Sequence, residues 1–172
     1  MDDRQYAKSE ALKMLRAAGI ALTKTEEENL EIADFGLNKL LDTGLELITY
    51  VNTERCCAKE LALLPGQTCP EHRHPPGFGG PGKEETFRCR AGEAYLYVPG
   101  EATPAPRAKP PKGDEAFYTV RREVILRPGE QYTIMPDTPH WFQGGPQGAV
   151  VSEFSTASHD DTDSFTNPNI IR

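Results

Sequence analysis

From residue 44 onward, the chain is a series of short runs rich in β-branched and aromatic residues, separated by glycine and proline turn signals. Strands this short need several neighbours to bury an apolar face, and many of them at close spacing are typical of a sandwich or barrel. The sequence therefore predicts an all-β domain. The runs cover residues 45–51, 56–64, 86–89, 94–98, 117–126, 132–135 and 149–154, with turn signals at 65–66, 91–92, 99–100, 128–129 and 144–146.

Short helices are expected before the strands. Residues 4–18 place apolar side chains near helical spacing, and Gly19 can end that helix. Thr25 and Glu28 have the spacing of a capping box, which predicts a second helix through about Ala33. We expect one domain of 172 residues, with a helical segment at 1–36, a β-barrel at 44–157 and a C-terminal tail at 158–172.

Charge and hydropathy exclude several classes of function. A formal net charge of −7 disfavours nucleic-acid binding, which needs a concentrated basic face. The apolar runs fall far short of the roughly 20 residues needed to cross a bilayer, and the N-terminus lacks a secretory apolar region. We therefore expect a cytoplasmic protein that binds neither nucleic acid nor membranes. Its cysteines lack CxxC spacing and are expected to be reduced thiols: Cys56, Cys57, Cys69 and Cys89.

Two histidines and a glutamate have the spacing of metal ligands. His72 and His74 are two residues apart, so on a strand their imidazoles point to one side. Glu85 begins the next β-like run, in phase with the apolar residues Phe87 and Cys89, which mark the inward face. We expect these three polar side chains to converge inside the barrel.

A third histidine completes the expected ligand set. His140 follows Gly129 by eleven residues, while His159 lies in a polar tail and is left out. Three imidazoles and one carboxylate suit Mn, Fe, Co, Ni or Zn, and leave two of six octahedral positions open for water or substrate. The sequence therefore predicts one divalent metal ion held by His72, His74, Glu85 and His140.

These spacings resemble the two motifs of the cupin superfamily. The first runs from Gly66 through the histidine pair to Glu85, and continues to Gly92, which we expect to be a hairpin turn. The second runs from Gly129 to His140. In cupins, the gap between the second histidine and the glutamate is usually three or four residues, whereas here it is ten. The resemblance implies a double-stranded β-helix, a jelly-roll barrel.

The chain as a whole resembles the compact bacterial D-lyxose isomerases of this superfamily. The resemblance implies conversion of D-lyxose to D-xylulose, a second reaction from D-mannose to D-fructose, and Mn²⁺ as the preferred ion, with Co²⁺, Fe²⁺, Ni²⁺ or Zn²⁺ as substitutes. It also implies a monosaccharide as the partner and, by analogy with small cupins that pair through their sheets, a homodimer. The segments that carry it are residues 70–76, 82–88, 136–142, 151–156 and 160–166.

An aldose–ketose isomerase also needs groups that move protons. Glu153 lies in an apolar run where a solvated carboxylate would be out of place, so it is a candidate base; the alternative is the outward face of an edge strand. Lys83 is in phase with Glu85 and is a candidate proton donor; the alternative is an ordinary loop lysine. Glu84 and Glu93 are weaker acid–base candidates. Trp141 and Phe142 are expected either to wall the pocket or to belong to the core. The glycine-rich segment 77–82, which includes Phe78, is expected to form a rim over the sugar site.

Three other functions stay open at this point. A sugar-phosphate isomerase of the cupin type that acts on glucose 6-phosphate would need cationic groups for a dianion, and the acidic balance weakens it. An iron-dependent oxygenase could use the same four ligands but would consume oxygen. A non-catalytic sugar-binding cupin would keep the metal as a structural element and have no turnover.

Overall fold

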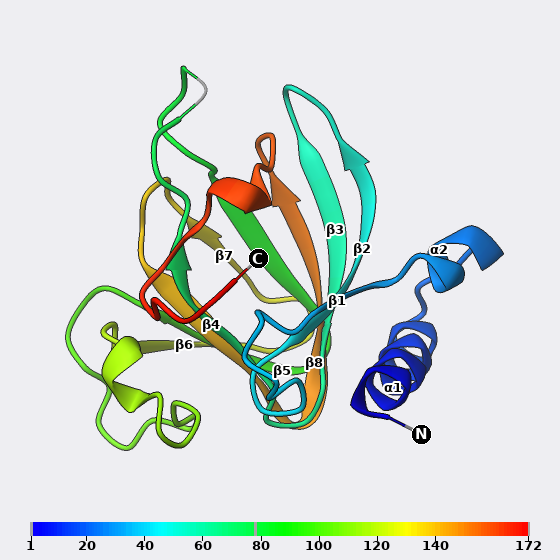
Figure 1. Cartoon of the computed structure of the whole chain (residues 1–172), viewed down its shortest axis with the longest axis horizontal. Helices are drawn as coiled ribbons and strands as arrows, with labels where there is room; N and C mark the ends of the chain where they lie inside the picture. Colours follow the sequence, from blue (N-terminus) through cyan, green and yellow to red (C-terminus); the bar gives the residue numbers. More distant parts are fainter. Residues whose placement is uncertain (1, 78, 172) are drawn as a thin grey trace.

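The strands form one antiparallel sheet that curls into a barrel (Figure 1). The computed structural model describes residues 2–77 and 79–171. Within these residues the sheet order is β1-β2-β3-β8-β4-β9, and β5 pairs with β6, β7 and β8. The strands are β1 (Glu31–Ala33), β2 (Leu45–Asn52), β3 (Cys57–Leu63), β4 (Thr68–Arg73), β5 (Glu85–Val98), β6 (Arg122–Leu126), β7 (Gln131–Ile134), β8 (His140–Ser155) and β9 (Ser164–Phe165).

This arrangement confirms the all-β class and the cupin barrel that the resemblance implied. Alternate side chains of each strand point into the barrel, as the period of two requires. Along β5, for example, Phe87 and Cys89 are buried inside, whereas Arg88 between them is half-buried on the other face. The inner cluster fills the barrel with aliphatic and aromatic side chains, among them Leu45, Leu61, Leu96, Phe142 and Val151.

The two longest strands are continuous at places where the sequence predicted turns. Gly92 was expected to form a hairpin, but it lies within β5 at φ +70° and accompanies a break in register against β8. Segment 144–146 was also expected to be a turn, but β8 runs through it. A Cβ on Gly144 would lie 2.6 Å from the Leu64 carbonyl oxygen, so this glycine allows a close backbone approach.

The first helix, α1 (Asp3–Ala17), packs outside the barrel against β2, β3 and β8 (Figure 1). The second, α2 (Lys24–Glu28), is shorter than predicted, and its capping box lies two residues earlier than expected. Thr23 and Glu26 form the box instead, because their side chains satisfy each other's backbone amides. Residues 31–33 are strand β1, not helix, because they pair with β2.

The predicted strand at residues 117–126 is also shorter than expected. The segment starts with a 3-10 helix, η1 (Glu115–Phe117), and becomes strand only at β6. Tyr118 and Val120 are buried against Trp141, whose indole Nε1 donates to the Val120 carbonyl oxygen at 3.0 Å. Side-chain packing and this hydrogen bond take the place of strand pairing here.

Candidate metal centre

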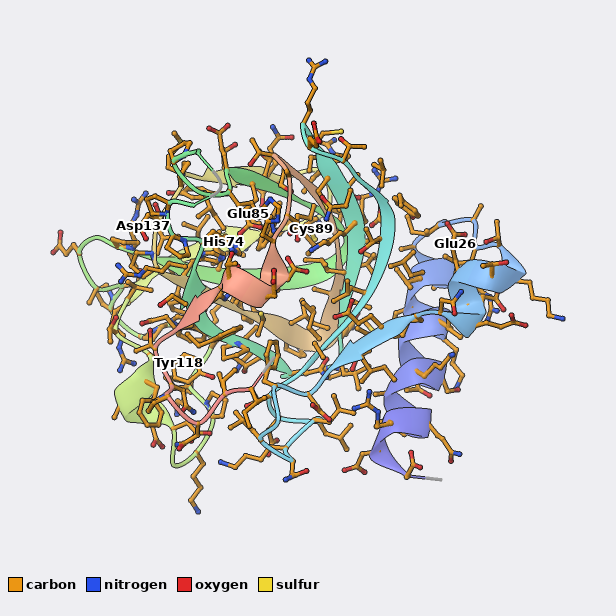
Figure 2. All side chains as sticks on the ribbon, turned by 45° about the horizontal axis from the view of Figure 1, so that its top comes forward. Glu26, His74, Glu85, Cys89, Tyr118 and Asp137 are labelled. Atoms are coloured by element: carbon orange, nitrogen blue, oxygen red, sulfur yellow. The ribbon has the colours of Figure 1, made fainter. Side chains whose placement is uncertain are left out.

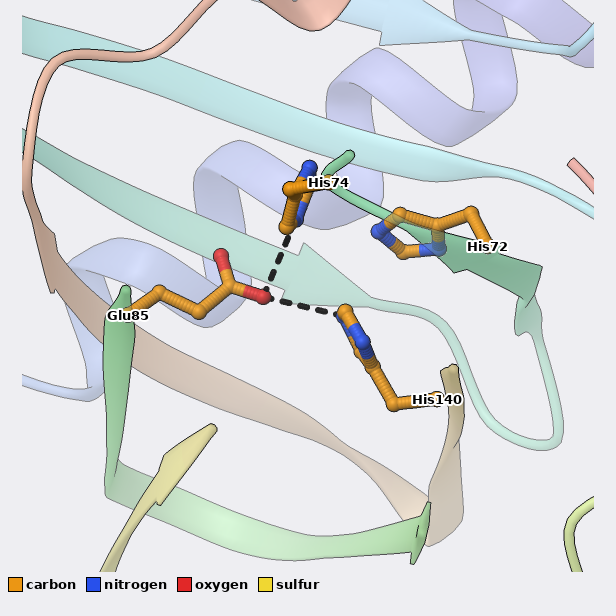
Figure 3. Close-up of side chains that lie close together, drawn as sticks. All are labelled: His72, His74, Glu85 and His140. Atoms are coloured by element: carbon orange, nitrogen blue, oxygen red, sulfur yellow. Dashed lines mark hydrogen bonds and ion pairs between the residues drawn. The ribbon is translucent and has the colours of Figure 1, made fainter. Parts of the chain in front are cut away.

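Four side chains converge inside one end of the barrel (Figure 3). One ligand atom of each lies within 4.8 Å of the others, and all four residues are buried. β4 carries the first, the second follows β4 directly, and the others begin β5 and β8. The cluster, called the metal cluster below, consists of His72, His74, Glu85 and His140, the residues that the sequence singled out.

Strand pairing brings these residues together. His72 on β4 lies opposite His140 on β8, and their ring centroids are 4.3 Å apart. Glu85 lies opposite Ser155 at the other end of β8 and points inward, in phase with Phe87. Figure 2 shows His74 and Glu85 among the strands of the barrel, whereas Glu26 lies on the helices outside it.

Each histidine has one ring nitrogen held by an acceptor, so the other faces the cluster. Nδ1 of His72 and of His140 lies 2.8 and 2.9 Å, respectively, from the carbonyl oxygen of the residue two positions earlier. Nδ1 of His74 lies 2.5 Å from Oδ1 of Asp163. An acceptor at Nδ1 fixes the proton there and leaves Nε2 as the lone-pair donor, which is how histidine ligands are oriented in metal sites.

The centre of the cluster suits a cation. Glu85 Oε1 lies 3.2 Å from His74 Nε2 and 2.9 Å from His140 Nε2 (Figure 3). Even so, within the described residues the buried His140 Nε2 has no partner with hydrogen-bond geometry. A divalent ion would satisfy this nitrogen, the other two ring nitrogens and the carboxylate together, and a donor set of three nitrogens and one oxygen fits first-row transition ions. The residues present therefore fit a bound metal ion.

Burial and neighbouring charges set the protonation of the cluster. Burial, and then the nearby His140 and His74, lower the pKa of His72 well below its ordinary value, so His72 is neutral. Burial alone would lower the pKa of His74, but Glu85 and the hydrogen bond with Asp163 raise it to about 9. Binding of a metal ion must therefore displace a proton from His74.

Lys83 and Glu153 lie beside the metal cluster and contact each other. Lys83 Nζ is 2.7 Å from Glu85 Oε2 and 2.5 Å from Glu153 Oε1. Glu153 lies opposite Phe87 in the sheet and is buried, so it points into the barrel and not outward. Burial disfavours the lysine cation, but Glu85 and Glu153 outweigh it and raise the pKa of Lys83 above its ordinary value.

A cavity of about 270 Å³ adjoins His74 and Lys83, which both form part of its wall. The wall continues through Gly77 and residues 80–82 on one side and through the C-terminal segment on the other. Phe78, expected at this rim, lies outside the described residues. Besides prolines and glycines, the remaining lining includes the polar side chains of Glu54, Glu84, Thr156, His159, Thr162 and Asp163.

Three candidates from the sequence do not line the cavity. The Glu93 carboxylate accepts a hydrogen bond from the Tyr95 hydroxyl at 2.8 Å and pairs with Arg127 at 3.2 Å, away from the metal cluster. Trp141 does not wall the pocket, because it stacks on Tyr97 with ring centroids 3.9 Å apart in a separate cluster. Phe142 is a core residue inside the barrel.

Asp163 is the residue that sequence reasoning missed. It reaches His74 across 89 positions of the chain, so no local spacing rule could connect the two. Only the resemblance of residues 160–166 to the isomerases drew attention to this segment.

Three curated proteins are similar to the chain over most of its length. It is 63% identical to a D-lyxose/D-mannose isomerase of Thermosediminibacter oceani, over 92% of this chain and 87% of that protein. It is 60% identical to a D-lyxose ketol-isomerase of Cohnella laeviribosi, over 96% and 91% of the two chains. The third, a D-lyxose ketol-isomerase of Thermofilum sp., is 57% identical over 96% and 92%.

Solved structures with the same fold include two L-ribose isomerases. The Acinetobacter sp. DL28 enzyme with L-ribose has a TM-score of 0.83 and 18% identity, covering 99% of this chain and 94% of that one. The Cellulomonas parahominis enzyme with L-ribose has a TM-score of 0.82 and 20% identity, with the same coverage. No protein-family model matches the sequence. Within the described residues, no helix is long and apolar enough to span a membrane.

Proposed function

Because the chain belongs to the D-lyxose isomerase family, we propose that it interconverts D-lyxose and D-xylulose, and also D-mannose and D-fructose. One observation supports this most strongly: a buried site with three histidines and one glutamate lies directly beside a buried lysine–glutamate pair. In this proposal Mn²⁺ is the preferred ion, and its ligands are His72, His74, Glu85 and His140.

The metal cluster gives the site its electrophile. A divalent ion bound by His72, His74, Glu85 and His140 would supply Lewis acidity toward the carbonyl group of the sugar. The protein orients its ligands in advance, since each imidazole is already held at Nδ1. The barrel keeps the ligands buried, which strengthens charge interactions at the reacting carbons.

Proton transfer is assigned to Glu153 and Lys83. In the aldose-to-ketose direction, the Glu153 carboxylate removes the proton from C2 while Lys83 donates a proton to the carbonyl oxygen on C1, which gives an enediol. Glu153 then delivers its proton to C1, and the C2 hydroxyl returns a proton to Lys83 as the C2 carbonyl forms. Each group ends as it began, so one pair serves both directions.

The direction of the lysine pKa supports this division of roles. Glu85 and Glu153 keep Lys83 protonated, so it enters the reaction as a cation and cannot serve as the first base. Glu153 is the carboxylate of this pair that does not belong to the metal cluster, and so it is free to act as the base. The adjoining cavity of about 270 Å³ lies just below the roughly 300–1,000 Å³ usual for drug-sized ligands, which suits a monosaccharide.

Substitution of the base tests the proposal. Glu153→Gln removes the proton acceptor but keeps the shape, so we expect turnover of D-lyxose to fall about 10²–10⁴-fold. The amount of bound Mn²⁺, measured on the same sample, should be unchanged. Glu93→Gln, at the far end of the barrel, is the matched control and should retain normal turnover. A Glu153→Gln variant with full activity would contradict the assignment.

Relatives named as isomerases of free sugars favour this function over a sugar-phosphate isomerase, an oxygenase or a sugar-binding module. The cytoplasm remains the proposed compartment. The cysteine thiols support it, because thiols persist in a reducing environment.

A homodimer is also part of the proposal. Val51, Ala58 and Phe154 lie in register across β2, β3 and β8, so their side chains share one face. Val51 is 39% exposed and Phe154 is 52% exposed, which leaves apolar area on the sheet for a second copy to cover.

A further inference from the structure

The three histidines of the metal cluster are not oriented in the same way. His72 and His140 are held by backbone carbonyl oxygens only two residues away, so their orientation is built into their own strands. His74 directly follows the end of β4 and is held by the Asp163 carboxylate, which is 89 residues away in sequence. Its orientation therefore depends on where the C-terminal segment lies.

The segment that carries Asp163 is anchored on both sides. We call residues 158–166 the strap; it contains the 3-10 helix η2 (Asp160–Thr162) and β9. Upstream, Lys59 Nζ lies 2.8 and 3.0 Å from the two carboxylate oxygens of Asp160, and the Lys59 side chain is only 5% exposed. The strap appears in red at the end of the barrel in Figure 1.

A second upstream contact joins the strap to β2, because the Asn52 side chain exchanges two hydrogen bonds with the Ser158 backbone at 2.9 and 3.0 Å. Downstream, β9 pairs with β4 at His72 and Arg73. Thr166 donates its backbone amide to the Glu71 carbonyl oxygen at 3.0 Å. Asp163 therefore lies between two fixed points, and the second of them is the strand that carries a metal ligand.

We propose that Asp163 is a positioning residue that fixes His74 as a metal ligand, so that metal affinity depends on the docked strap. This inference rests on the metal site of the proposed function. A carboxylate at Nδ1 holds the ring in one orientation and increases the basicity of the nitrogen that faces the metal. The Asp163 side chain is only 6% exposed, so water competes little for this contact.

The test is Mn²⁺ affinity at constant pH, measured on chelator-stripped full-length protein by competition with a fluorescent divalent-metal chelator. We expect Asp163→Ala to weaken Mn²⁺ binding about 10–100-fold, the range found when such outer partners are removed. Asp163→Asn keeps a neutral acceptor and should lose less. Asp161→Asn is the matched control, because it removes the same charge from an exposed position of the same strap, and it should bind Mn²⁺ within about twofold of the unmodified chain.

The visible absorption spectrum of bound Co²⁺ is a second measurement, and it would not change if Asp163 only stabilised the fold. The absorption bands report ligand geometry, and they should shift in Asp163→Ala and Asp163→Asn but not in Asp161→Asn. Unchanged affinity and spectra in both Asp163 variants would overturn the inference. If Asp163→Ala does not fold, as judged by circular dichroism, Asp163→Asn decides the question.

The outcome is separable from that of the proposed function. Weaker Mn²⁺ binding in the Asp163 variants upholds the inference even if the unmodified chain converts no sugar. Unchanged binding in those variants, in a chain that isomerises D-lyxose, overturns the inference alone.

Discussion

Buried charged side chains in this protein fall into two kinds of environment. Lys83 forms ion pairs with both Glu85 and Glu153 inside the barrel. Glu46 on β2 is fully buried, and its Oε1 accepts a hydrogen bond from the uncharged Gln67 amide at 3.0 Å. Within the described residues its other oxygen, Oε2, has no hydrogen-bond partner. Glu46 is thus a carboxyl group whose charged form the fold disfavours.

Burial raises the pKa of Glu46 to about 7, from an ordinary value of 4.5. Between these two pH values the folded chain holds a proton that the unfolded chain has released, so stability falls as pH rises through this window. A shift of this size corresponds to about 3 kcal/mol at most. Glu46→Gln cannot titrate at this position, so we expect its stability to be less sensitive to pH. Between pH 4.5 and pH 7.5, the free energy of unfolding should decrease by about 3 kcal/mol more in the unmodified chain than in Glu46→Gln.

Urea denaturation at several pH values, with a chelator present to remove metal effects, measures this difference. Glu101→Gln changes an exposed glutamate and should keep the pH dependence of the unmodified chain. Equal slopes for Glu46→Gln and the unmodified chain would show that the pKa of Glu46 is the same in the folded and unfolded chains, and would contradict the raised value.

At the scale of elements, the long strands depend on glycines that allow close approach of the backbone. Gly92 lies at φ +70°, and an added Cβ would be 2.1 Å from the Gly148 carbonyl oxygen. Gly66 has a similar φ of +74°, but nothing lies within 4 Å of its Cβ position. Alanine substitution at these two glycines therefore distinguishes the cost of backbone strain from the cost of steric overlap.

We expect Gly66→Ala to cost about 1 kcal/mol of stability, from backbone strain alone. Gly92→Ala should cost about 3 kcal/mol or more, because the β5–β8 pairing must also move apart. Chemical denaturation of both variants measures the difference. Similar losses for the two variants would mean that the bulge at Gly92 adapts freely.

Glycines also account for the strand features that could not be predicted from the sequence. The strand runs and the inward phase of Glu85, Phe87 and Cys89 follow from a period of two, and the sequence predicted both. Gly92 and segment 144–146 have the same local signal as a turn, since glycine serves turns and bulges alike. The choice between them depends on strands elsewhere in the chain, which pair on both sides of β8.

At the scale of the whole molecule, the barrel brings together the four residues of the metal cluster, which the cupin motif spacings had singled out as candidate ligands. The contact between Asp163 and His74 was not predictable, because it requires the tail to fold back over the barrel. The inward position of Glu153 could not be derived from the sequence alone, because it depends on the strand register that places Glu153 opposite Phe87.

The proposed dimer is tested at this scale. Sedimentation velocity should give a mass of twice the 19.0 kDa chain, and Phe154→Glu should shift the protein toward the monomer by placing a charge in the apolar row. Tyr6→Glu, which changes an exposed aromatic on α1 outside that row, is the control and should leave the mass unchanged. A monomeric unmodified chain would contradict the proposal.

The most direct test of the central claim is conversion of D-lyxose by chelator-stripped protein, with and without added Mn²⁺, with D-xylulose measured by chromatography. We expect no ketose without the ion and steady formation with it, because the proposed metal ion would polarise the sugar carbonyl. If no divalent ion supports conversion, the proposed activity is wrong, although the metal cluster itself would stand.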